Sequence, residues 1–215
     1  MLDGPAAAAV SDRGFSGALG LAAEHRHFSF SKEIRTDNGQ NYVIVQDDQV
    51  PCFRITDPKA EVFTELHYES FPGADDDEYI APATVFYRNA LGGSVCSMVF
   101  HHRIVYSQYN EPRKKFLIEI LERLRGRKLP AVSADAQNVT VLARKYPDGA
   151  VIAEVCNINF DPLKKIALRC AEIPREVEHL AGDGTWVKTA FEADGDCIRV
   201  NIPLACYELT VLRIR

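Results

Sequence analysis

The sequence predicts an α+β fold in two parts: a strand-rich, partial α/β domain over residues 1–130 and an all-β sandwich over residues 131–215. Three observations predict it. Residues 28–101 contain short alternating or continuous apolar stretches separated by turn residues, a pattern typical of strands. One long amphipathic helix follows at residues 110–126. Beyond it, short strand-like stretches alternate with turns up to the C-terminus, as they do in sandwiches.

A short helix is expected near the N-terminus. Asp3 suits its N-cap, Pro5 suits its first turn, and the alanines that follow are strong helix formers. Gly14 should end it. Most domains begin with a strand or a tail rather than with a capped interior helix. We therefore expect that Met1 is not the natural start of the protein.

The first region should contain six strands. Asn38-Gly39 is a strong hairpin signal between the first two of them. Val62, Leu66 and Tyr68 are expected on one face of the longest strand, and residues 71–82 are expected to form a loop. The predicted strands cover residues 28–34, 41–46, 51–56, 60–70, 83–89 and 93–101.

The long helix is the clearest element. Asn110 suits its N-cap and Pro112 its first turn, while Gly126 and Pro130 should stop it. Its apolar residues recur at helical spacing and should face the core, whereas the charges between them form a solvated face. This apolar stripe consists of Phe116, Leu117, Ile120, Leu121 and Leu124.

The C-terminal region should contain seven strands. Turn residues separate them, among them Pro147-Asp148-Gly149 and Asp194-Gly195-Asp196. The predicted strands cover residues 138–146, 150–160, 164–173, 176–181, 186–191, 197–202 and 206–215.

Composition limits the classes of partner. The chain has 215 residues, of which 47% are hydrophobic and 26% charged, and its net charge is −5. Neither half is basic, which argues against nucleic acid and against an anionic membrane as partners. No signal peptide or membrane-spanning stretch is evident.

No cysteine pair has CxxC spacing, and Cys96, Cys156 and Cys206 lie in apolar runs as small buried residues do. Reduced thiols and a cytoplasmic location are therefore expected.

Four stretches, taken in order, resemble the C-terminal part of a bacterial β-galactosidase-type glycoside hydrolase. In that family a catalytic (β/α)8 barrel precedes a glutamine-amidotransferase-like domain, called the trimerisation domain in some members, and a small β-sandwich ends the chain. The stretches are residues 2–21, residues 60–100, residues 109–131 with their Leu-Pro-Ala ending, and the sandwich strands with the turn at Asn157 and Asp161.

The resemblance implies a fragment. The catalytic glutamates of the family would lie on a barrel upstream, so no catalytic residue is assigned here. The leading expectation is a non-catalytic accessory region that packs against the barrel, supports a homo-oligomer or shapes the substrate entrance. The alternative is a free-standing carbohydrate-binding module, and an independent enzyme is the third hypothesis. A truncated sheet would expose an edge and an apolar face, so the isolated chain should self-associate or be poorly soluble.

Trp186 is the weak candidate for sugar binding. It is the sole tryptophan and follows the Gly182–Gly184 turn, so it could stack on a sugar ring or pack across the sandwich. Tyr106 and Tyr109, before the long helix, are candidates for contact with a neighbouring domain or subunit.

No metal or cofactor is assigned. The acidic run Asp75–Glu78 lacks the spacing of an EF-hand and is expected to be a solvated loop. Asp194 and Asp196 are expected to form a hairpin turn. His25 and His27 would share one face of a strand but lack a third ligand. His101 and His102 would point to opposite faces. A nucleophilic triad is disfavoured because no G-x-S-x-G motif is present.

Overall fold

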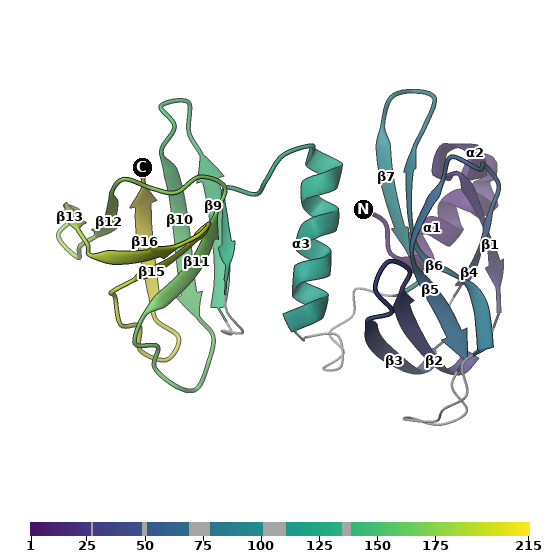
Figure 1. Cartoon of the computed structure of the whole chain (residues 1–215), viewed down its shortest axis with the longest axis horizontal. Helices are drawn as coiled ribbons and strands as arrows, with labels where there is room; N and C mark the ends of the chain where they lie inside the picture. Colours follow the sequence, from purple (N-terminus) through teal and green to yellow (C-terminus); the bar gives the residue numbers. More distant parts are fainter. Residues whose placement is uncertain (27, 49–50, 69–77, 101–110, 135–138) are drawn as a thin grey trace. The chain divides into compact units, whose positions relative to one another are not determined.

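A computed structural model of the chain describes residues 1–26, 28–48, 51–68, 78–100, 111–134 and 139–215 (Figure 1). The chain forms two compact units, Met1–Leu124 and Arg125–Arg215. Each unit has its own hydrophobic core. The two units are described in turn.

The first unit is built on a five-stranded sheet in the order β3-β2-β5-β6-β7. All four pairings in this sheet are antiparallel. A hairpin turn at Asn38 and Gly39 joins the first two strands, and Gly39 has a φ of 68°, which a glycine adopts without strain. The strands are β2 (Phe28–Arg35), β3 (Asn41–Asp48), β5 (Glu61–Tyr68), β6 (Glu78–Arg88) and β7 (Ser94–Met98).

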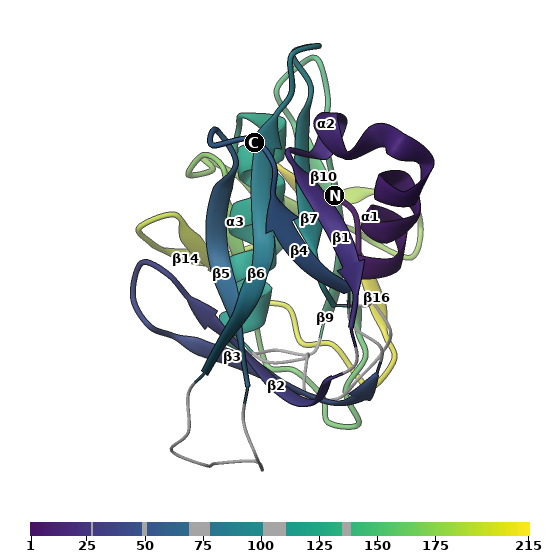
Figure 2. The ribbon, with the colours of Figure 1, turned by 90° about the vertical axis from the view of Figure 1, so that its right-hand side faces the viewer.

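Short helices and a two-stranded sheet cover one face of this five-stranded sheet (Figure 2). The helix begins as predicted, because the Asp3 side chain accepts a hydrogen bond from the amide of Ala6 at 3.1 Å. Gly4 lies so close to β7 that a Cβ there would be 2.0 Å from the carbonyl oxygen of Val99. The covering elements are α1 (Gly4–Val10), the kinked segment η1 (Ser11–Phe15), in which Gly14 has a non-helical φ of 85°, α2 (Ser16–Leu19), β1 (Leu21–His25) and β4 (Pro51–Ile55).

The long helix α3 (Glu111–Arg125) covers the opposite face. Phe116 and Ile120 are buried against Phe86, Cys96 and Met98 of β6 and β7, as the apolar stripe predicts. Gly126 ends the helix with a φ of 65°. The predicted N-cap, Asn110, lies outside the described residues.

The second unit is a β-sandwich. One sheet has the order β13-β12-β16-β10-β9 and the other β14-β15-β11-β8, and both sheets bury their inner faces in one core. The strands are β8 (Ala131–Ser133), β9 (Val139–Lys145), β10 (Val151–Asn157), β11 (Ile166–Cys170), β12 (Val177–Leu180), β13 (Trp186–Lys188), β14 (Phe191–Asp194), β15 (Cys197–Val200) and β16 (Leu209–Ile214).

The strand-rich α+β class and the sandwich are confirmed. The antiparallel pairing in the first unit adds no support for an amidotransferase-like domain, because sheets of the α/β class are usually parallel.

Several predicted boundaries are wrong. The expected loop at 71–82 ends earlier, since β6 begins at Glu78 and includes Pro82 beside a register shift in β5. The same register shifts separate Leu66, which is buried, from Tyr68, which is 37% exposed. The predicted strand 186–191 is two strands in different sheets, because the chain changes sheets after Lys188.

Candidate functional site

Trp186 lies on the outer face of the five-stranded sandwich sheet. It is the first residue of edge strand β13 and pairs with Leu180. Leu180 lies three residues after the core residue Val177 on the same strand, so its side chain points to the opposite, outer face of the sheet. The guanidinium carbon of Arg213 lies 4.4 Å from the centroid of the indole ring. Trp186 thus does not pack across the sandwich, and a cation occupies one face of its ring.

Arg213 is fixed over this ring by an ion pair. Its Nε donates to Oε2 of Glu178 at 2.6 Å, and Arg215 approaches the same oxygen at 3.8 Å. The hydrogen bond from Arg213 lowers the pKa of Glu178 below its usual range. Trp186 is therefore part of an ordered charged cluster, and a sugar could stack on its other face alone.

An open groove lies on the same outer face, near the opposite edge of the sheet. Four inter-strand intervals separate β13 from β9, which is about 19 Å at about 4.8 Å per interval. The groove has a volume of about 470 Å³. Its lining includes Leu142, which is 62% exposed, Tyr146, Ile152 and Val211, with the charged side chains of Arg144 and Glu154. Arg144 lies over the ring of Tyr146, 5.3 Å from its centroid.

A second cavity, of about 350 Å³, lies in the first unit. Cys52 and Phe53 form part of its buried lining, and Tyr79 lies at its exposed side. Arg26 and Arg54 approach the same residue, Glu24, at 2.9 and 3.4 Å. No pattern in the sequence predicts this cavity, because its residues come from three separate strands and the segment after β1.

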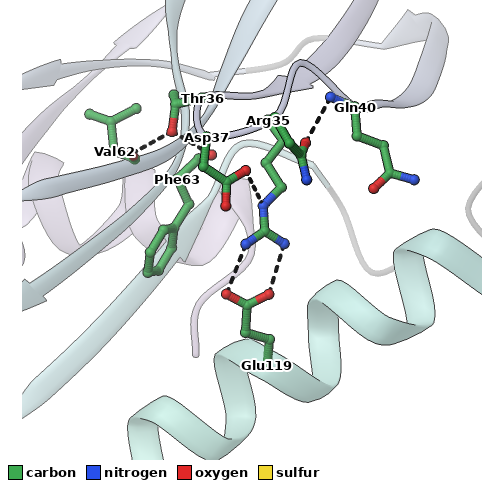
Figure 3. Close-up of polar contacts among 8 residues, drawn as sticks. Arg35, Thr36, Asp37, Gln40, Val62, Phe63 and Glu119 are labelled. Atoms are coloured by element: carbon green, nitrogen blue, oxygen red, sulfur yellow. Dashed lines mark hydrogen bonds and ion pairs between the residues drawn. The ribbon is translucent and has the colours of Figure 1, made fainter.

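Several ion pairs of the first unit fix α3 to the sheet. Arg35 of β2 donates from both Nη atoms to the carboxylate of Glu119, at 2.7 and 2.9 Å, and from Nε to Asp37 at 2.6 Å (Figure 3). This bidentate geometry is the strongest that an arginine and a carboxylate can adopt. The hydrogen bond from Arg35 lowers the pKa of Asp37.

A buried carboxylate forms a second attachment. Glu33 of β2 is fully buried, and its Oε1 accepts hydrogen bonds from Thr64 and, at 2.7 Å, from Thr84. Its Oε2 accepts from Arg113 of α3, which is 4% exposed. Glu33 has no contact with solvent, so its carboxylate stabilises the packing of α3 against the sheet and is not accessible to a substrate.

Arg123 of α3 provides a third attachment. It pairs with Glu61 of β5, and its guanidinium lies over the rings of Phe63 and Phe86, 4.7 and 4.5 Å from their centroids. Three arginine–glutamate pairs thus fix this helix, and the carboxylates in them are engaged by cations.

The other sequence candidates have separate outcomes. Asp194-Gly195-Asp196 forms the predicted turn between β14 and β15, and Asp196 pairs with Lys128 at 3.2 Å. Within the described residues, no three histidine, cysteine or acidic side chains gather where they could hold a metal ion. The candidates that lie outside the described residues or side chains are His25, His27, Asp75, Asp76, Asp77, His101, His102, Tyr106 and Tyr109.

The cysteines differ in burial. Burial raises the pKa values of Cys52, Cys96 and Cys170 to about 11, 12 and 11, so their thiols are unreactive at neutral pH. Cys156 is partly buried, whereas Cys206 is exposed. The prediction for Cys206 is wrong because its apolar run begins in a loop before β16. No disulfide joins the six cysteines.

Comparison with known proteins gives a fold relationship. No protein-family model matches the chain, and no curated protein matches its sequence. It is similar in structure to α-L-fucosidase isoenzyme 2 from Paenibacillus thiaminolyticus, with a TM-score of 0.52 and 12% sequence identity. The two share a fold. The similarity covers 91% of this chain but 33% of the fucosidase chain, so this chain spans about a third of that enzyme's length. No helix among the described residues is long and apolar enough to cross a membrane.

Proposed function

We propose that this chain is a non-catalytic accessory region of a glycoside hydrolase-like protein that acts in carbohydrate metabolism. The observation that carries the proposal is the similarity of nearly the whole chain to a third of an α-L-fucosidase. The order of the four sequence stretches agrees with it. In this proposal the region packs beside a catalytic barrel, supports a homo-oligomer or shapes the substrate entrance, and the parent protein is cytoplasmic.

The state of two carboxylates, those of Glu33 and Glu119, agrees with a non-catalytic role. A glycosidase needs two carboxyl groups that reach the same glycosidic bond, about 5–5.5 Å apart in retaining enzymes and about 6.5–9.5 Å apart in inverting ones. Glu33 is sealed from solvent, and Glu119 is engaged on both of its oxygens by Arg35. These carboxylates stabilise the fold instead of facing a substrate.

Two measurements test the proposal. Purified chain should not hydrolyse 4-nitrophenyl α-L-fucoside or 4-nitrophenyl β-D-galactoside, and clean turnover would overturn the accessory role.

The gene should also be sequenced upstream of the Met1 codon. We expect an open frame that encodes a (β/α)8 barrel with two glutamates facing its C-terminal mouth. A stop codon and a ribosome-binding site directly upstream would instead favour a free-standing protein.

The second candidate function is a carbohydrate-binding module. The open groove with Leu142 and Tyr146, and Trp186 on the same outer face, favour it. Affinity electrophoresis in galactan tests this candidate. Retardation that is lost in Trp186→Ala would support binding beside β13, and loss in Tyr146→Ala would support binding in the groove. Equal mobility with and without galactan would exclude galactan as the ligand.

A further inference from the structure

Tyr207 adopts a backbone conformation that non-glycine residues rarely adopt. Its φ is 58°, and it is the one non-glycine residue with a positive φ in the described part of the chain. Its side chain is also 61% exposed, so burial of the ring does not compensate for this conformation. A strained and exposed residue persists where the surrounding backbone imposes it, and such residues cluster at functional sites.

The surrounding backbone is fixed by one buried amide. Asn157 is fully buried, and its Nδ2 donates to the carbonyl oxygens of Asp161 and Ala205, both at 3.0 Å. Its Oδ1 accepts from the amide of Asn159 at 3.0 Å. The loop after β10 and the loop before β16 are thereby joined. A two-way backbone bridge between Leu163 and Leu204, at 2.8 and 2.9 Å, joins them a second time.

These joined loops present two aromatic rings to solvent. Phe160 is 86% exposed, and its ring meets that of Tyr207 edge to face, with centroids 5.9 Å apart and planes at 89°. The two perpendicular rings form a corner, and the high exposure of both side chains leaves ring surface accessible to a ligand. Ile158 and Leu209, each two positions along the chain from one of the rings, are 45% and 48% exposed. Exposed aromatic rings on a fixed backbone are typical of a recognition site, because little conformational entropy is lost when a ligand binds.

We propose that this corner, formed by Phe160 and Tyr207, binds one ring of a neutral sugar. The proposal rests on the carbohydrate-related role proposed above and names a site for it. The apolar C–H face of a pyranose matches one aromatic ring in size, and its hydroxyl groups need acceptors nearby. The same two loops contain three residues with side-chain acceptors, namely Asn159, which is partly buried, and Asp161 and Glu208, which are exposed. Oε2 of Glu208 already accepts a hydrogen bond from the amide of Ala205 at 2.6 Å. The two carboxylates would repel a sulfated or uronic sugar, which makes the expected ligand neutral.

A second copy of the chain is a weaker occupant. The centre of a protein–protein interface is depleted of charged residues. Here Asp161 and Glu208 stand in the same short loops as the two rings, and the apolar surface is small. A single sugar ring fits this mixture of apolar faces and polar groups better.

The test is affinity electrophoresis of the full chain in gels that contain neutral galactan or fucose-containing xyloglucan, with polygalacturonate as the acidic comparison. We expect retardation by a neutral glycan. Phe160→Ala and Tyr207→Gly should each weaken association at least about tenfold, as truncation of an aromatic anchor does. Phe15→Ala, which removes a 61% exposed aromatic ring of the first unit that belongs to no candidate sugar site, should have no effect.

Folding of the variants is checked by thermal melts. Phe160 is almost fully exposed, and glycine adopts the φ of residue 207 without strain, so neither change should lower Tm. Retardation that survives both changes but is lost in Tyr146→Ala or Trp186→Ala would overturn the corner as the site and leave sugar binding intact. No retardation by any neutral glycan would overturn the corner and leave the accessory role standing. A wild-type dimer that Phe160→Ala converts to a monomer, seen by light scattering, would reassign the corner to self-association.

Discussion

Removal of the arginine that faces the buried carboxylate should destabilise the first unit severely. In Arg113→Met, the Glu33 carboxylate stays fully buried and faces two threonine hydroxyls without its guanidinium partner. Loss of one partner from a buried ion pair costs about 3–5 kcal/mol. That is a large share of the roughly 5–15 kcal/mol that holds a typical domain folded. Arg113 is also packed over Phe100 and Phe116, so part of the loss is packing, which methionine restores in part.

Urea denaturation can measure this loss unit by unit. The ellipticity at 222 nm is dominated by the helices, and α3 is the longest of them. Trp186 is the sole tryptophan and belongs to the second unit, so its fluorescence follows the unfolding of the sandwich. We expect Arg113→Met to move the ellipticity transition to lower urea and to leave the fluorescence transition in place.

Two further variants separate charge from packing. Arg54→Met removes an exposed arginine of the same unit, 3.4 Å from Glu24, and should cost less than about 1 kcal/mol. Glu33→Gln combined with Arg113→Met keeps an acceptor for the threonines but removes the buried charge, and should recover about half of the loss. If Arg113→Met is within about 1 kcal/mol of the wild type, the buried pair does not contribute what its burial implies.

Three other predictions concern local features. Gly4→Ala should cost about 1–3 kcal/mol in urea denaturation because its new methyl group meets the backbone of Val99, the residue after β7, whereas Gly17→Ala, in open space, should be neutral or stabilising by up to about 1 kcal/mol. Iodoacetamide followed by mass spectrometry at pH 8 should modify Cys206 first, since burial raises the pKa of the three buried thiols to about 11 or 12; equal labelling of those thiols would contradict the burial. The hydrogen bond from Arg213 lowers the folded-state pKa of Glu178 below 4.5, so its contribution is present above that pH and is lost as the pH falls. Glu178→Gln should flatten the acid limb of a Tm-versus-pH profile, and an unchanged limb would show that other groups dominate it.

Local chemistry made part of the fold predictable. Asp3 caps its helix and Gly126 ends another because each acts on backbone groups within four residues. The Asn38-Gly39 turn works in the same way. By contrast, Ala131–Ser133 was not predicted as a strand, because such a short segment is stabilised by pairing with β11 and not by its own sequence.

The candidate sites depend on long-range contacts and were mostly hidden. Trp186 was selected from the sequence, but the cation over its ring comes from Arg213 of another strand. Phe160 and Tyr207 lie in separate loops, and long-range contacts, among them those of Asn157 and the bridge between Leu163 and Leu204, bring them together. The turn at Asn157 and Asp161 was visible in the sequence, and it was the signal closest to that corner.

The attachment of α3 has a consequence for the order of folding. Its ion pairs join residues that are 80, 84 and 62 positions apart in the chain. During synthesis the sheet strands leave the ribosome first, so the apolar face around Phe86 and Met98 has no cover until the helix follows. A nascent chain in this interval is the form most in need of a chaperone. The helix therefore acts as the closing step of folding, and variants that weaken its docking should lower the yield of soluble protein more than their equilibrium stabilities suggest.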